Sequence, residues 1–185
     1  MARIRRANLP QRRVPVLREQ LESLVLQSPG NVRDPIQLVK RYSDPADVEV
    51  AAVFASALAF GRVEAFMPVI QALLEVAQSS GGPARWVAEF DERSQAALSP
   101  MLYRWIRGPD LILLARTLGE LRRVHGSLYA IVSQGHDAAH SDLGPALEHL
   151  ITHIRQAAVD IAGVQDFSDL SRGFRHALPR PSSGS

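Results

Sequence analysis

The sequence predicts an all-α protein, a single compact multi-helix domain built around one buried helix. Apolar residues recur at three- and four-residue spacings along most of the chain, and no segment alternates apolar and polar residues as a half-buried strand does. The pair Asp-Pro occurs at 34–35 and at 44–45. This pair is typical of helix starts, because Asp accepts hydrogen bonds from free amides and Pro has no amide that needs a partner.

Length and composition limit the class of protein further. The chain has 185 residues, 46% of them apolar, and can bury one sizeable core. It has no cysteine, which excludes disulfides and thiolate metal sites. No apolar run is long enough to cross a bilayer and no signal-peptide core is present, so we expect a cytoplasmic protein without membrane contact.

Positive charge is concentrated at the N-terminus. Residues 1–18 contain six arginines and no acid; the whole chain carries +2, so the remainder carries −4. We expect a flexible basic arm over residues 1–13, a helical domain over 14–178 and a tail over 179–185. A basic arm is suited to binding phosphate, and the alternative is a solvated terminus. The candidate nucleic-acid contacts in the arm are Arg3, Arg5, Arg6, Arg12 and Arg13.

The buried helix is expected from Asp44 to about Phe60. Nearly every residue from Val48 onward is apolar, so the side chains surround the helix axis and burial on all sides is predicted. Asp44 is the expected cap, and Asp47 is expected to favour the positive end of the helix dipole. Gly61 ends this helix.

The other helices follow from apolar stripes between breaker residues. Pro68 lies too deep for a first turn in a helix that begins near Val63, so we expect a kink or a later start. In the helix from about Leu143 to Ala162, Leu147 is expected to face inward. No structure is predicted for residues 91–100. The remaining predicted helices are one opening at Pro15, a short one after Asp34-Pro35, and others over 83–90, 108–125, 128–132 and 167–178.

The best nucleic-acid surface within the domain is the segment 103–107, together with Arg62. Arginine can hold phosphate while an aromatic ring stacks on a base, so Tyr103, Arg104 and Arg107 are candidate contacts. The alternative is that part of this segment belongs to the core, and Trp105 is expected there.

No catalytic residue, metal site or cofactor is predicted. His149 and His153 have the spacing of helical metal ligands, as do His136 and His140 in a polar loop, but we expect solvated side chains. Glu49 and Ser56 share one strip of the buried helix. A buried Glu49 could act as an acid or base, but we favour a structural role in which it binds backbone amides or an arginine such as Arg62.

Several short segments, in this order, resemble a bacterial family of conserved hypothetical proteins catalogued as a domain of unknown function. The resemblance covers roughly residues 30–185 and is specific as a set. Its segments are Asp34-Pro35 with Arg41-Tyr42, Asp47-x-Glu49-x-Ala51-Ala52, Leu58 to Arg62, Tyr103-Arg104-Trp105, Gly108-x-Asp110-Leu111, His125 to Leu128, Phe174 to Leu178, Pro179-Arg180-Pro181 and Gly184-Ser185.

The resemblance implies a distant relation to helix-hairpin-helix DNA glycosylases, in which 58–62 would form a turn near DNA. It also implies that the catalytic half follows the segment ending at Ser185, so we expect nucleic-acid association without independent catalysis. The expected partners are DNA, a second copy of the chain or the missing half. In the latter two cases, apolar surface is expected at 103–106 and 167–178. The alternatives are a helical protein-interaction or structural module and a metal-dependent hydrolase.

Overall fold

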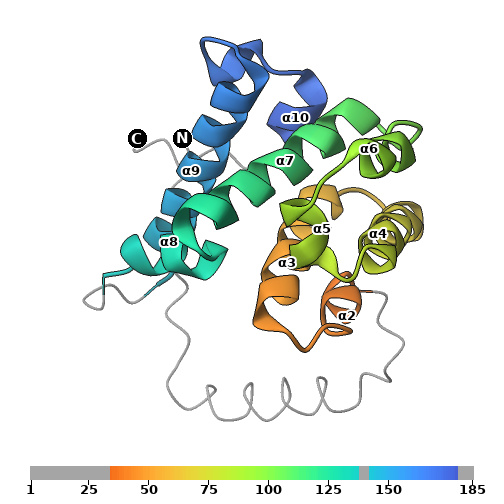
Figure 1. Cartoon of the computed structure of the whole chain (residues 1–185), viewed down its shortest axis with the longest axis horizontal. Helices are drawn as coiled ribbons and strands as arrows, with labels where there is room; N and C mark the ends of the chain where they lie inside the picture. The colour runs from red at the N-terminus through yellow and green to blue at the C-terminus, as the bar shows by residue number, and fades with distance from the viewer. Residues whose placement is uncertain (1–33, 138–141, 179–185) are drawn as a thin grey trace, which may run out of the picture. The chain divides into compact units, whose positions relative to one another are not determined.

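The computed structural model describes residues 34–137 and 142–178, and the all-α class is confirmed (Figure 1). The predicted arm, the helix opening at Pro15 and the tail lie outside the described residues. The described helices are α2 (Ile36–Val39), α3 (Pro45–Leu58), α4 (Val63–Ser79), α5 (Pro83–Ala88), α6 (Glu92–Leu98), α7 (Gly108–His125), α8 (Leu128–Gln134), α9 (Gly144–Ala162), the 3₁₀ turn η2 (Phe167–Asp169) and α10 (Arg172–Ala177).

Two long helices organise the packing of this part of the chain. Helix α3 packs against α2, α4 and α5, whereas α7 packs against α5 and α9 (Figure 1). Helix α5 thus contacts both the group of helices around α3 and the group around α7. Its Trp86 is 1% exposed, and the ring lies 5.5 Å from that of Phe54 on α3. Gly119 on α7 makes the α5–α7 crossing close, because a Cβ at this position would lie 2.2 Å from the carbonyl oxygen of Val87. The core is therefore continuous across both groups.

The start of α3 follows the prediction, but one of its acids has a different partner. Asp44 caps the helix, accepting a hydrogen bond from the amide of Ala46 at 2.9 Å. The carboxylate of Asp47 accepts a 2.8 Å hydrogen bond from the amide of Ala84, in the first turn of α5. Asp47 therefore lies in the first turn of α3 and also satisfies a free amide in the first turn of α5. This hydrogen bond joins the two helices.

The prediction that α3 is buried on all sides is wrong. Phe54, Ala55 and Leu58 are buried, but Ser56 is exposed. The strip that contains Ser56 faces a groove, which none of the described helices fills. The other residues of this strip of α3 are half-buried: Val48, Glu49, Ala52 and Val53. Apolar composition predicts that a surface is suited to burial, and the neighbouring elements decide whether it is covered.

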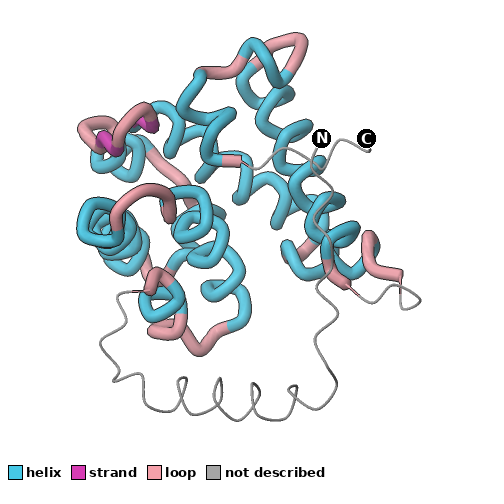
Figure 2. Tube along the Cα trace, turned by 180° about the vertical axis from the view of Figure 1, so that it is seen from behind, coloured by secondary structure: helices cyan, strands magenta, loops and turns pink. Residues whose placement is uncertain are grey.

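A short β-hairpin, which was not predicted from the sequence, is the main difference from the predicted secondary structure. Strands β1 (Leu102–Tyr103) and β2 (Ile106–Arg107) pair antiparallel between α6 and α7 (Figure 2). Two-residue strands are too short to show alternation in a sequence. The helix α6 was also missed; Asp91 caps it by accepting a 2.8 Å hydrogen bond from the amide of Ser94, and the hydrogen bonds from Ser94 lower the pKa of Asp91.

Two other helices differ in their limits. Helix α4 begins at Val63 and continues through Pro68, so of the two expected alternatives, a kink or a later start, the later start is wrong. The segment 167–178 is divided into η2 and α10, because Leu170 is extended and Ser171 begins a new helix by accepting a hydrogen bond from the amide of Phe174 at 3.0 Å. This division places α10 against the hairpin and the end of α3.

Candidate functional site

An aromatic cluster forms where the end of α3, the hairpin and α10 meet. The rings of Phe60 and Trp105 are nearly parallel, with an interplanar angle of 22° and centroids 5.4 Å apart. The imidazole of His176 on α10 meets both rings edge-on, at 4.8 Å from Phe60 and 4.4 Å from Trp105. Three segments that are distant in sequence therefore share one cluster of rings.

Hydrogen bonding and backbone conformation support this cluster. The hydroxyl of Tyr103 donates a hydrogen bond to the backbone carbonyl of Phe60, so the hairpin is tied to the end of α3. Gly61 has φ +90°, which favours glycine, and a Cβ there would lie 3.1 Å from the Tyr103 hydroxyl. Arg104 also has a positive φ, of 55°. The turn between the strands thus holds Arg104 in a conformation that non-glycine residues seldom adopt.

Arginines surround the aromatic cluster. The guanidinium carbon of Arg104 lies 5.8 Å from the ring centroid of Phe60 and 5.4 Å from that of Trp105, and that of Arg172 lies 5.7 Å from Trp105. Arg62 and Arg107 are exposed, and each follows a ring of the cluster, Phe60 and Trp105 respectively, by two positions in the sequence. Within residues 34–137 and 142–178, no ion pair involves any of these four arginines. We call Phe60, Trp105, His176 and the four arginines the arginine–aromatic surface.

The structure changes the role of two predicted residues and adds others. Tyr103 is only 6% exposed and its hydroxyl is bonded to Phe60, so the predicted stacking of Tyr103 on a base is wrong. Trp105, predicted to be core, is half-buried at the edge of the core. Sequence reasoning missed Arg172 and His176, whose only signal was the run of basic residues in 172–176.

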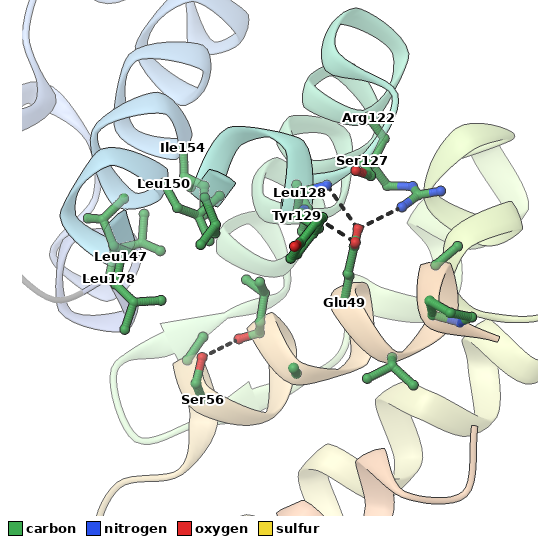
Figure 3. Close-up of a pocket in the computed structure, with 18 of the residues that line it drawn as sticks. Glu49, Ser56, Arg122, Ser127, Leu128, Tyr129, Leu147, Leu150, Ile154 and Leu178 are labelled. Atoms are coloured by element: carbon green, nitrogen blue, oxygen red, sulfur yellow. Dashed lines mark hydrogen bonds and ion pairs between the residues drawn. The ribbon is translucent and has the colours of Figure 1, made fainter. Parts of the chain in front are cut away.

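The second feature is a groove of about 1320 Å³ between α3, α8 and α9, which reaches α10 at one end. Apolar side chains line it, among them Leu128 of α8, Leu150 and Ile154 of α9, and Leu178 just after α10 (Figure 3). The expected apolar surface at 103–106 and 167–178 is instead mostly internal, since Ile106, Phe174 and Leu178 are buried. An apolar concavity among the described residues is instead formed by α3, α8 and α9.

Glu49 lies at the polar end of this groove (Figure 3). Its carboxylate accepts hydrogen bonds from the backbone amides of Leu128 at 2.8 Å and Tyr129 at 3.2 Å, and pairs with Arg122 at 3.1 Å. These are free amides of the first turn of α8, so Glu49 anchors that helix to α3 and α7. The structural role is supported, with Arg122 as the arginine rather than Arg62.

The prediction that the histidines of α9 are solvated is wrong. His149 and His153 are half-buried, and their ring centroids lie 4.4 Å apart. His153 also meets His125 at the end of α7, at 5.4 Å, while its Nδ1 lies 2.8 Å from the backbone oxygen of His149. Leu147, predicted to face inward, is 51% exposed. Leu150, Ile154 and Ala158, also predicted to face inward, are buried, so the predicted stripe holds apart from its first residue, and of the two histidines it is His153 that contacts α7.

Two classes of site find no support in the part of the chain that the structure describes. No group of three or more His, Asp or Glu side chains there is arranged to hold a metal ion. No helix there is long and apolar enough to span a bilayer.

Fold and site together define a helical domain with an arginine–aromatic surface beside an apolar groove. The chain belongs to the family described as protein of unknown function (DUF2400), whose model matches residues 34–185. No curated protein and no solved structure matches the chain. The resemblance to a family of unknown function is therefore confirmed.

Proposed function

We propose that this domain binds nucleic acid through its arginine–aromatic surface. The observation that carries the proposal is that Arg104 and Arg172 lie over aromatic rings and have no acidic partner among the described residues. Arginine recognises phosphate because its planar group offers several donors, and duplex DNA presents closely spaced phosphates. The proposal is one of binding, and it assigns no catalytic step to these residues.

The aromatic rings act in this proposal as supports for the arginines. Both Phe60 and Trp105 already contact each other and the guanidinium of Arg104, so neither ring offers two open faces to a base. A ring beneath a guanidinium restricts the side chain before any ligand arrives, and less conformational entropy is lost on binding. This geometry favours contact with the phosphate backbone over stacking on bases.

We further propose that the family is distantly related to helix-hairpin-helix DNA glycosylases, which would make DNA the expected nucleic acid. Arg62 and Arg107 would add phosphate contacts at the edge of the surface, and the arm would add more through Arg3, Arg5, Arg6, Arg12 and Arg13. Those arm residues lie outside the described residues, so their contribution stays a prediction.

Replacing Arg104 and Arg172 together by Gln is expected to weaken binding to duplex DNA and flatten its salt dependence. Each phosphate contact contributes about 0.9 to the slope of log K against log salt, so the double variant should lower the slope by about 2. The measurement is fluorescence anisotropy of a labelled duplex between 50 and 200 mM salt, conditions over which this term is large.

The control removes two exposed arginines from outside the surface, Arg93 on α6 and Arg116 on α7. It lowers the net charge by the same amount, so it separates the local contact from general attraction. A slope equal to that of the control would contradict the proposal, as would a wild-type protein that does not bind duplex DNA at all.

A second candidate function, a protein-interaction module, is favoured by the groove. The occupant that fits its surroundings is a second copy of the chain. Its rim carries exposed apolar side chains, Tyr129 at 71% and Leu147 at 51%, of the kind that a two-fold symmetric pair would place in each other's groove. Formation of this dimer would also bury the apolar strip of α3 that faces the groove.

Leu147→Glu is expected to abolish self-association without loss of fold, because the side chain is half exposed and the new charge would enter an apolar interface. Sedimentation velocity at micromolar concentration should show a dimer for the wild type and a monomer for the variant. Leu102→Glu is the matched control, since Leu102 is 62% exposed and outside the groove. A monomeric wild-type protein would rule out this candidate.

A further inference from the structure

A basic hollow lies beside the arginine–aromatic surface, bounded by α9, η2 and α10. Its volume is about 580 Å³, and three arginines line it: Arg155, Arg172 and Arg175. Arg172 also lies over the ring of Trp105, so it belongs to both the hollow and the surface described above. A ligand that follows the arginine–aromatic surface would therefore reach this hollow next.

Arg155 is held in place inside the hollow. Its guanidinium carbon lies 3.8 Å from the ring centroid of Phe167, and the residue is half-buried. The stacked group still has its N–H donors in the plane of the guanidinium, pointing away from the ring axis. Arg155 is thus a preformed donor, in the same way as Arg104 on the neighbouring surface.

One carboxylate, that of Asp166, also lines the hollow. It accepts a 2.7 Å hydrogen bond from the amide of Ser168, and its pKa is lowered chiefly by this bond, with a smaller contribution from the charge of Arg155. The carboxylate is therefore ionised at neutral pH. Three guanidinium groups and one carboxylate give the arginines and Asp166 of the lining a net charge of +2.

We propose that this hollow binds the terminal phosphate of a nucleic-acid strand whose backbone follows the arginine–aromatic surface. This inference rests on the proposed function. A terminal phosphate monoester carries a charge of about −1.5 to −2 and three acceptor oxygens, which matches the two positive charges and three arginines. An internal phosphodiester carries a single negative charge and matches the hollow less well. The hollow would give the domain a preference for strand ends.

The test compares three oligonucleotides of one sequence, with a 5′-phosphate, a 3′-phosphate, or hydroxyl groups at both ends. We expect the wild-type chain to bind one of the phosphorylated ends at least tenfold more tightly than the hydroxyl ends. Arg175→Gln should reduce this preference to threefold or less, because Arg175 is exposed and contributes one of the three guanidinium groups. Arg93→Gln, outside the hollow, should leave the preference unchanged.

A titration with inorganic phosphate locates the site independently of any oligonucleotide. In the wild type, the NMR signal of the Arg155 Nε–H group should shift with saturation, and in Arg175→Gln the shift should weaken several-fold. A preference for phosphorylated ends without a response at Arg155 would overturn the assignment to this hollow.

The outcomes separate this inference from the function on which it rests. Equal affinity for all three oligonucleotides would overturn the terminal-phosphate site and leave nucleic-acid binding intact. Absence of binding to every oligonucleotide would overturn both.

Discussion

Ala55→Glu is expected to leave the chain unfolded at 25 °C. Ala55 is 4% exposed on α3, within the core that α3 shares with its neighbours. An unpaired carboxylate at this position would cost several kcal/mol, against a total stability of about 5–15 kcal/mol for a typical domain. Circular dichroism and urea titration of the purified variant should show no cooperative unfolding transition.

The adjacent position supplies the control. Ser56→Glu places the same side chain on the same helix, but Ser56 is exposed beside the groove. It should unfold cooperatively with a free energy of unfolding within about 1 kcal/mol of the wild type. If Ala55→Glu were as stable as Ser56→Glu, α3 would not be central to the fold.

Gly119→Ala is expected to destabilise the protein by about 2–3 kcal/mol, the cost of overpacking a close helix crossing. In an open helical position the same substitution would stabilise by about 0.5–1 kcal/mol, because alanine loses less backbone entropy than glycine. Here the new methyl would meet the Val87 carbonyl at 2.2 Å, so α5 and α7 must separate. The sign of the change in unfolding free energy therefore decides whether the crossing is close.

Val124→Ala is the comparison on the same helix. Val124 is 57% exposed on α7, so truncation removes little packing and the stability should change by less than about 0.5 kcal/mol. The measurement for both variants is the free energy of unfolding from urea titration. A Gly119→Ala protein more stable than the wild type would show that α5 and α7 have room between them.

The candidate site was predictable only in part. Arg62, Arg104 and Arg107 were identifiable because basic residues beside aromatic ones suggest phosphate binding. The same reasoning mistook Tyr103 for a stacking residue, since residue type does not show that its hydroxyl is bonded to Phe60. Arg155 gave no sequence signal, because its role depends on the ring of Phe167, which the fold brings against its guanidinium group.

The sequence by itself determined the fold class, most helix positions and several helix starts of the described residues. These features depend on local chemistry: the spacing of apolar residues, and caps such as Asp44, act within a few positions of the chain. The sequence also indicated that Glu49 has a structural role, because a carboxylate among apolar residues needs donors.

Only the tertiary structure decided which surfaces are covered and which side chains meet. It left one strip of α3 open to the groove, bound Glu49 to the amides of α8, and brought Arg172 over Trp105. The physical reason is that burial and pairing depend on the relative orientation of helices. On α9, Leu150 and Ile154 are buried while Leu147 one turn earlier is exposed, because the neighbouring helices cover only part of the apolar stripe.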